Sequence, residues 1–497
     1  MISQKYLISF SLIVGVLYTL SFVAPVVLAQ EALDDTSSSG ASTESVTSAY
    51  DAVLKAVLII SQVALVGLIF NHLILHRSLR HNKKSHENNI DQFVSASSYH
   101  SSRKLTIFLL ICCISIIAFS TGIVLLSSYE LAQNLEFDMS SAFWIVYSTP
   151  VGDVWMLRIV TSFVIIGILM FYRIMISRNF SHNNKNKKRL NQKQEQEQDQ
   201  DHYQIEFNYG KLDRILLISI LVISSFNLYS NSMVSHSNSL DSFSSLAVSV
   251  DWIHFMAVSI WIGGLFYLTA LFTKRNSITS NKSDIIDKNI VPNISEENAL
   301  EQMTQGLMYF SFIAVTAISV IGITGLYLAF VHLQNLSFLL ISVYGLILII
   351  KLSLAFPMIF IGRYNQGKIY NYAKLISTSN ADTKRNTEGH QDLEIKPNSI
   401  VFLRKINKSL KIESVLGISV LVAASFLSVT SPPSLDSLNQ NLTSSNLDVH
   451  SSTDIFASNL TLLYLVIFLS IIISIFGIMN FKKNQKQIKE VVSPSTP

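Results

Sequence analysis

Long apolar runs alternate with polar and basic stretches along the chain. Nine runs have the length of about 20 residues that an α-helix needs to cross the hydrocarbon core of a membrane, two of them only with polar flanking residues. They are Tyr50–Leu75, Leu105–Ser127, Val154–Ile176, Ile215–Tyr229, Trp252–Phe272, Leu307–Val331, Phe338–Gly362, Val415–Val429 and Leu460–Ile478. The pattern predicts an all-α, polytopic bundle of transmembrane helices.

The composition supports this fold class. Of the 497 residues, 49% are hydrophobic and 14% are charged, and the mean hydropathy is +0.40. A soluble domain carries charge on about a quarter of its residues, so the composition excludes a soluble enzyme. A net charge of +4 gives no support for nucleic-acid binding. Cys112 and Cys113 are adjacent within an apolar run, and we interpret them as small packing residues.

Lysine and arginine are concentrated in alternate loops. The loops after the first, third, fifth and seventh predicted spans and the segment after the ninth are basic, whereas residues 230–251, 332–337 and 430–459 contain no Lys or Arg. Basic loops stay on the cytoplasmic side of a membrane. The alternation therefore predicts a protein of the cell membrane with an outer N-terminus and a cytoplasmic C-terminus.

The segments outside the predicted spans are polar, apart from the N-terminus. Residues 1–29 have the basic start, apolar stretch and final Ala29 of a secretory signal, although the stretch is also long enough for an uncleaved anchor. The polar composition of residues 30–49 predicts a disordered extracellular leader. We interpret the stretches near 177–211, 273–305 and 363–411 as solvated cytoplasmic loops, with lipid-headgroup binding as an alternative. The remaining segments are an outer loop at 434–459, a ninth span at 460–480 and a cytoplasmic tail at 481–497.

Histidine and methionine residues gather on the predicted outer side of the membrane. Those that we consider as metal ligands are His254, His332, His236 and Met233. Cu(I) prefers thioether and imidazole ligands, which hard, oxygen-seeking ions do not share, so this side suits copper. The alternative is that the methionines are packing residues and the loop histidines are solvated.

The stretch from Asp251 to Gly264 in the fifth span has the highest density of candidate functional residues. Asp251 and His254 are three residues apart and share a helix face, so the carboxylate could fix the tautomer of the imidazole. Ionisable residues inside spans are costly, which favours a function for His254 over an interfacial position beside the tryptophans. Gly263 and Gly264 would allow a neighbouring helix to approach closely.

Two cations also lie inside predicted spans. Arg158 could pair with Asp153 or extend to lipid headgroups. Lys351 lies about 13 residues into the seventh predicted span, or roughly 20 Å from its outer end at helical rise. We expect Lys351 to face the interior of the bundle, where it would mark a permeation path or stabilise a carboxylate, with snorkelling to the inner surface as the alternative.

Four stretches of the chain resemble, in order, the copper-resistance D (CopD) family of membrane proteins. The most recognisable is His254-x6-Trp261-x-Gly263-Gly264. The others are Thr149-x-x-Gly152-x-x-Trp155-x-x-Arg158, a helix that contains Lys351 and closes with Arg363-Tyr364-Asn365, and Glu413-x-x-x-Gly417 followed by Pro432-Pro433. The resemblance covers about residues 50–433, an eight-span membrane domain, and leaves the ninth span as an addition.

The resemblance implies a protein of copper homeostasis that moves copper across the cell membrane, usually inward. It also implies a CopC-type soluble copper-binding partner, which would be a separate protein because the leader is too short to contain it. The residues that it carries over are His254, Trp261, Gly263, Gly264, Arg158, Lys351 and Glu413, and of these His254 is the plausible copper ligand.

We therefore expect copper, with Cu(I) favoured, to bind to His254 with help from His332, His236 or Met233. The chain shows no ATP-binding motif, so transport would be passive, ion-coupled or driven by chelation inside the cell. One alternative is an electron-transfer protein that binds a b-type haem, with His254 and His332 as axial ligands at similar depth. Another is a non-transporting copper sensor or scaffold.

Overall fold

The structure is a computed structural model, and it describes residues 42–81, 91–190, 199–239, 244–282, 294–333, 337–385 and 396–434, with four single positions after them. Every secondary-structure element in this part of the chain is helical. The predicted signal, residues 30–41 of the leader, the loop from residue 435 to 459, most of the ninth span and the tail lie outside the described residues.

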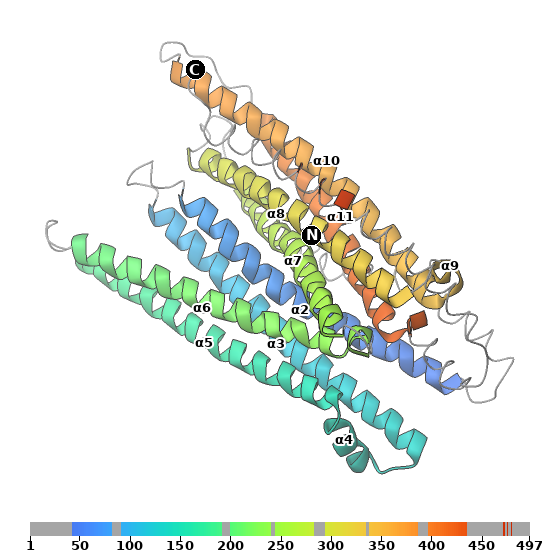
Figure 1. Cartoon of the computed structure of the whole chain (residues 1–497). Helices are drawn as coiled ribbons and strands as arrows, with labels where there is room; N and C mark the ends of the chain where they lie inside the picture. Colours follow the sequence, from blue (N-terminus) through green and yellow to red (C-terminus); the bar gives the residue numbers. More distant parts are fainter. Residues whose placement is uncertain are drawn as a thin grey trace.

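Eight long helices form the bundle (Figure 1). They are α2 (Ser42–His81), α3 (Asp91–Leu135), α5 (Pro150–Leu190), α6 (Asp199–Met233), α7 (Ser244–Lys282), α8 (Ile294–Leu333), α10 (Val343–Arg385) and α11 (Lys396–Val429). Each of the eight contains a stretch long and apolar enough to cross a membrane. For the described residues, the predicted all-α, multi-pass fold is confirmed.

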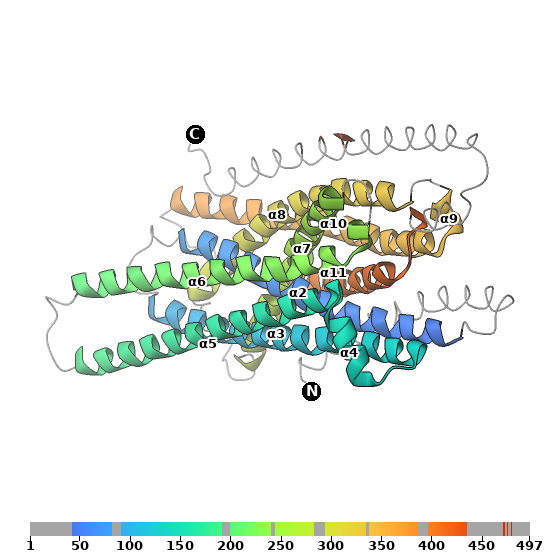
Figure 2. The same cartoon turned by 60° about the horizontal axis from the view of Figure 1, so that its bottom comes forward.

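Three short elements connect the long helices at one end of the bundle, which we call the η2 end. They are α4 (Met139–Tyr147), η2 (His236–Ser239) and α9 (Phe338–Ile341). Helices α4 and α9 are visible at the right of Figure 2. Asp138 caps α4, since its carboxylate accepts hydrogen bonds from the backbone amide and the hydroxyl of Ser141 at 3.1 and 2.7 Å. The basic-loop pattern predicts that the η2 end faces outward.

The helices continue beyond their apolar stretches. Helices α5, α7 and α10 extend to Leu190, Lys282 and Arg385, within segments predicted to be loops. Helix α2 begins at Ser42, within the predicted disordered leader. The loops near 177–211, 273–305 and 363–411 are therefore shorter than predicted. The reason is that Lys, Arg and Gln are good helix formers and that no Pro lies in these three extensions, while α10 continues through the single Gly367.

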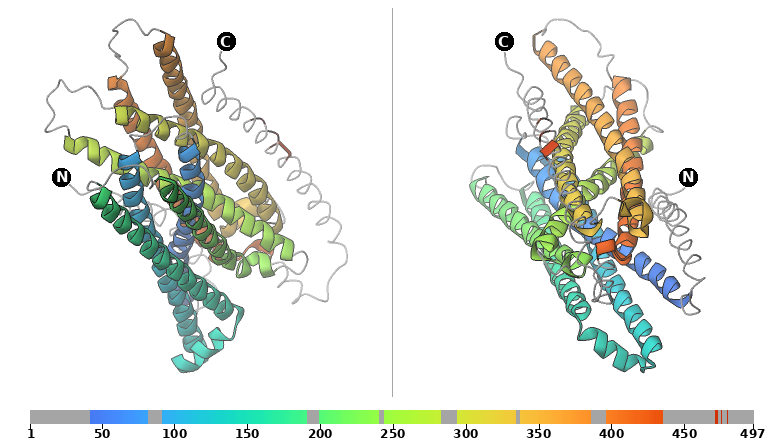
Figure 3. Two further views of the ribbon diagram at one scale, coloured as in Figure 1. Left: turned by 90° about the vertical axis from the view of Figure 1, so that its left-hand side faces the viewer. Right: turned by 45° about the vertical axis from the view of Figure 1, so that its right-hand side comes forward.

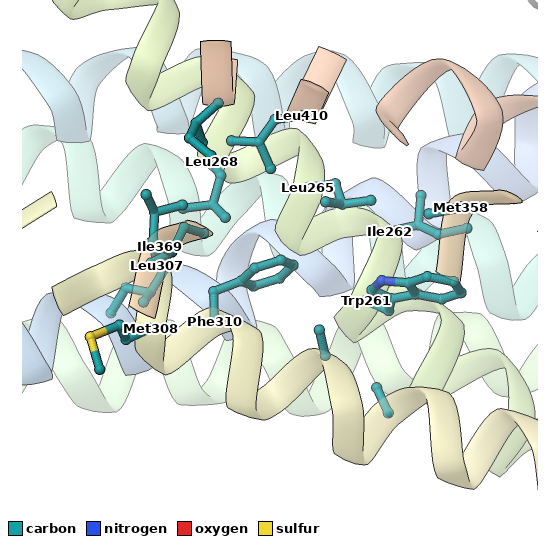
Figure 4. Close-up of a cluster of buried hydrophobic side chains, with 14 of the residues drawn as sticks. Trp261, Ile262, Leu265, Leu268, Leu307, Met308, Phe310, Met358, Ile369 and Leu410 are labelled. Carbon is teal, nitrogen blue, oxygen red and sulfur yellow. The ribbon is translucent and has the colours of Figure 1, made fainter. Parts of the chain in front are cut away.

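Helices α2 and α7 occupy the centre of the bundle and lie against each other. Gly67 of α2 and Gly263 of α7 form their closest contact, where a Cβ on either residue would overlap the backbone of the other helix. A Cβ on Gly264 would meet the side chains of Phe310 and Asn71. An apolar cluster continues from this contact through Trp261, Ile262, Leu265, Leu307 and Phe310 (Figure 4). The contact fixes the spacing of the two central helices.

The other long helices flank this central pair on two sides (Figure 3). Helices α3, α5 and α6 pack together on one side, and α8, α10 and α11 on the other. We call these groups the α3–α5–α6 half and the α8–α10–α11 half. The residues with candidate chemistry lie on both halves, on the central helix α7 and in η2.

Candidate functional site

Two of the predicted histidines meet at the η2 end. His236 begins η2, and His332 lies one residue before the end of α8. Their ring centroids are 6.4 Å apart and their planes are inclined by 79°. Tyr344, near the start of α10, also contacts His332, with ring centroids 6.1 Å apart. The fold thus brings together imidazoles that are almost 100 residues apart in the sequence.

Each imidazole of this pair has a buried nitrogen without a hydrogen-bond partner. These atoms are Nε2 of His236 and Nδ1 of His332. The other nitrogen of His332, Nε2, lies 3.4 Å from Oγ of Ser237. Buried polar atoms in proteins are nearly always hydrogen-bonded, so two unpartnered nitrogens on neighbouring rings are unusual. Such atoms can accept a ligand without breaking an existing bond.

The surroundings of His236 favour its neutral form. Burial lowers its pKa below the ordinary value for histidine, and the positive charge of Lys55 on α2 lowers it further. A hydrogen bond with the Thr430 backbone acts in the opposite direction but does not reverse the shift. A neutral imidazole has the free lone pair that metal binding requires.

His254 lies deeper in the bundle, on α7, and Thr324 of α8 fixes its tautomer. Its Nδ1 is 2.9 Å from Oγ1 of Thr324. The Thr324 hydroxyl donates its own hydrogen to the backbone carbonyl of Val320 at 2.7 Å. Thr324 must therefore accept from Nδ1, which leaves the lone pair of His254 on Nε2. The predicted partner, Asp251, does not make this bond.

Asp251 and Lys351 place opposite charges beside His254. Lys351 of α10 interacts electrostatically with both Asp251 and His254. Ser232 and Ser235 also lie close enough to affect the carboxylate of Asp251, yet its Oδ2 is buried without a hydrogen-bond partner. The charges of Asp251 and Lys351 therefore act on each other, although no ion pair joins them among the described residues.

The depth of these residues differs from the sequence prediction. Helix α7 begins at Ser244, before the predicted start of the span, so His254 lies ten residues or about 15 Å from the helix start. Ser342 adopts an extended conformation, with ψ of 151°, and separates α9 from α10. Lys351 is therefore eight residues into α10, or about 12 Å from its start rather than 20 Å.

The haem alternative requires His254 and His332 to lie at similar depth, but in the structure they do not. His254 contacts Thr324, and His332 is eight residues further along α8, which corresponds to about 12 Å along the helix axis. The two axial ligands of a haem bind opposite faces of one flat ring and must lie much closer together. The geometry does not favour this histidine pair as haem ligands.

The remaining predicted residues occupy separate positions. Met233 ends α6, shortly before η2, and its backbone carbonyl accepts a hydrogen bond from Asn238 at 3.0 Å. Trp261 belongs to the apolar core between α7 and its neighbours. Gly325, next to Thr324, lies against the imidazole of His254, because a Cβ there would be 3.4 Å from its Cε1. The small residue thus lets α8 approach His254.

Arg158 binds neutral side chains in the α3–α5–α6 half rather than Asp153 or lipid headgroups. Its Nε donates to Oγ of Ser230 at 2.7 Å, and its Nη2 donates to Oδ1 of Asn231 at 2.9 Å. Asn231 in turn donates to Gln62 of α2 at 2.7 Å, and Gln62 donates to Oδ1 of Asn227 at 2.8 Å. This network joins α2, α5 and α6.

Sequence reasoning missed Thr324 and Tyr344 as neighbours of the histidines, and Gln62 and Asn227 as parts of the Arg158 network. Gln62 and Asn227 gave a usable signal, since polar amides inside apolar spans generally bond to neighbouring helices. Thr324 and Tyr344 gave none, because such residues are common near the ends of spans.

Comparison with known proteins gives no relative: no protein-family model, curated protein or solved structure matches the chain. Within the described ranges, no group of three or more His, Cys, Asp and Glu side chains is arranged to hold a metal ion. The fold defines a multi-pass helical membrane protein. Its most distinctive site is the histidine pair at the η2 end, followed inward by Asp251, His254 and Lys351.

Proposed function

We propose that the protein binds Cu(I) at the η2 end and transports it across the cell membrane. The observation that carries the proposal is the pair of buried, unpartnered nitrogens on His236 and His332. Imidazole is a good ligand for copper, and Cu(I) is stable with only two nitrogen ligands, whereas most divalent ions require more. A pair of neutral imidazoles therefore suits Cu(I) as the transported ion.

The second step of the proposal is transfer from the histidine pair to His254. The lone pair on Nε2 of His254 provides the next nitrogen ligand, about 12 Å further along the axis of α8. The carboxylate of Asp251 offsets the charge of Lys351 beside this position, so that a second cation is not repelled. Asp251 thereby keeps the path open to a positive ion.

The remaining parts of the proposal follow from the sequence. The basic-loop alternation supports an outward-facing η2 end and a cytoplasmic C-terminus. The resemblance to the CopD family supports inward transport and delivery of copper by a separate CopC-type protein. The lipid bilayer surrounds the bundle in this proposal.

The first test is the copper content and optical spectrum of detergent-purified protein after equilibration with Cu(I). We expect stoichiometric copper in the wild type and its loss in His236→Ala and His332→Ala. His72→Ala is the matched control, because His72 is a buried imidazole of α2 that bonds to Tyr267 away from the η2 end. Equal copper in the wild type and both η2-end variants would overturn the proposed site.

The second test separates binding from transport. His254→Ala should retain copper at the histidine pair but reduce Cu(I) flux in proteoliposomes by at least about tenfold, because the next ligand is missing. Unchanged flux would remove His254 from the path. A Soret band in the purified wild type would favour the haem alternative over copper transport.

A further inference from the structure

A buried carboxyl group lies near the end of the bundle opposite to η2. Glu413 of α11 is only 3% exposed. It is eight residues into the apolar stretch that begins at Lys405, which corresponds to about 12 Å of helix. The copper path proposed above does not use this residue. Burial of an ionisable group inside a span is costly, and such groups generally have a function.

The hydrogen bonds of Glu413 are few. The side-chain amide of Asn365, on α10, donates to Oε1 of Glu413 and also lies 2.8 Å from Oγ of Ser409. The second carboxyl oxygen faces Gly362, where an added Cβ would be 3.7 Å away. The absence of a side chain at Gly362 thus keeps the space beside Oε2 open.

Among the described side chains near this end of the bundle, no cation forms an ion pair with Glu413. On α10, Arg363 donates to Gln366 at 2.8 Å, and Nζ of Lys368 lies 4.2 Å above the ring of Tyr364. On α11, Lys405 and Lys408 are exposed and Lys411 is half-buried. Among the described residues the ion pair found is Lys55–Asp51, on α2.

Ser414, the next residue along α11, contacts α7. The Oγ1 atom of Thr269 lies 3.0 Å from the hydroxyl oxygen of Ser414. An ionised carboxylate without a cation is unfavourable in such surroundings, whereas the Asn365 donor favours ionisation. Burial and the hydrogen bond therefore act in opposite directions on the same proton.

We propose that Glu413 is a proton-exchange site at the exit of the cation path. When a cation reaches this end, the carboxylic acid releases its proton to the adjacent water and the carboxylate neutralises the cation. When the cation leaves, the carboxylate takes a proton back from the same side. The coupling to copper rests on the proposed function, whereas the exchangeable proton does not.

Infrared spectroscopy of the metal-free protein tests whether Glu413 carries an exchangeable proton. A protonated carboxylic acid has a carbonyl stretch that is distinct from the carboxylate bands and shifts in D2O. We expect such a band to disappear with rising pH in the wild type and to be missing in Glu413→Gln, which keeps the size of the side chain and an oxygen for Asn365. Asp251→Asn is the control, and it should leave the band unchanged.

Asn365→Ala provides an independent readout. Loss of the amide donor removes the bond that favours the carboxylate, so the band should persist to higher pH than in the wild type. The proposal is overturned if no band depends on Glu413, or if Asn365→Ala leaves the titration unchanged.

The coupling is tested with a pH-sensitive dye inside proteoliposomes. A pulse of Cu(I) should release protons on the side of Glu413 in the wild type and not in Glu413→Gln, although both bind copper at the η2 end. Copper binding without proton release in the wild type would overturn the coupling. A wild type that shows the infrared band but binds no copper would overturn the proposed function and support the proton site alone.

Discussion

The network around Arg158 and the histidine pair at the η2 end differ in how their buried polar groups are satisfied. Around Arg158 in the α3–α5–α6 half, the side chains of Ser230, Asn231 and Gln62 bond to one another in a continuous network. At the η2 end, His236, Asp251 and His332 each have a buried atom without a partner, as does Ser232 at the end of α6. Arg158 lies eight residues, or about 12 Å, from the start of α5 at this end.

The difference teaches how to separate structural polar groups from candidate ligands. An unpartnered buried polar atom costs about 1–3 kcal/mol, so a region without function gains stability when such atoms are bonded. The network around Arg158 has reached this state and holds three helices together. The histidine pair has not, which is the expected condition of a site that binds a ligand.

The largest expected effect is a loss of stability in Asn231→Leu, which disrupts the network around Arg158. This change removes the oxygen that accepts from Nη2 of Arg158 and leaves a buried guanidinium without it. We expect a loss of about 3 kcal/mol in the free energy of unfolding, with copper binding unchanged in the protein that remains folded. Denaturant unfolding in detergent measures the first and copper content the second. A copper defect without a stability defect would contradict the structural assignment.

Separation of the two central helices should affect both halves together. A Cβ at Gly67 would overlap the backbone of α7 at Ser259 and Gly263, whereas an added Cβ at Gly167 meets no atom within 4 Å. We expect Gly67→Ala to lower the free energy of unfolding by up to about 3 kcal/mol. Gly167→Ala should have no comparable effect. Equal unfolding midpoints for the two variants would show that the close contact is not required.

Thr324→Val sharpens the comparison by changing one hydrogen bond at the site. Without the acceptor for Nδ1, His254 loses its fixed tautomer, and we expect about a tenfold lower Cu(I) flux. Thr121→Val is the matched control, because Thr121 accepts from Trp155 at 3.2 Å outside the copper path. Flux in liposomes should fall for Thr324→Val alone. An equal fall for both variants would indicate general damage to the bundle.

The smallest expected effect concerns pH. Because burial and Lys55 lower the pKa of His236, protons should compete with copper only below the ordinary histidine pKa of about 6.5. Lys55→Met should raise this pKa and shift the loss of copper to higher pH. In the unfolded chain this histidine has its ordinary pKa, so it binds a proton at a higher pH than it does in the folded protein. Its contribution to stability therefore decreases as the pH falls below about 6.5. An unchanged copper–pH profile in Lys55→Met would contradict the assignment.

Much of the fold followed from local patterns in the sequence. The first predicted span, Tyr50–Leu75, differs by one residue from the stretch Ala49–Leu75 in the structure. Larger differences occur where polar residues continue a helix, as at Ser244, or where one residue interrupts it, as at Ser342. Hydropathy marks where a chain can enter a membrane, but it does not record where helical hydrogen bonding stops.

The candidate site was only partly predictable. The cost of ionisable residues in a membrane drew attention to His254, Lys351 and Arg158. Their partners depended on which helices are neighbours. Arg158 bonds to Asn231, a residue 73 positions away, and His254 bonds to Thr324, 70 positions away. No local spacing rule connects residues on separate helices.

The sequence by itself determined that this is a multi-pass helical membrane protein, because span length and hydropathy are local properties of each segment. It also supplied the residues whose burial would be costly. The tertiary structure decided which of them lie on neighbouring helices: the Gly67–Gly263 contact sets the central helices, and α8 packs against both α7, which carries His254, and α10, which carries Lys351. Helix packing alone distinguishes the bonded network around Arg158 from the unpartnered imidazoles, because hydrogen bonds between helices require exact placement that composition does not encode.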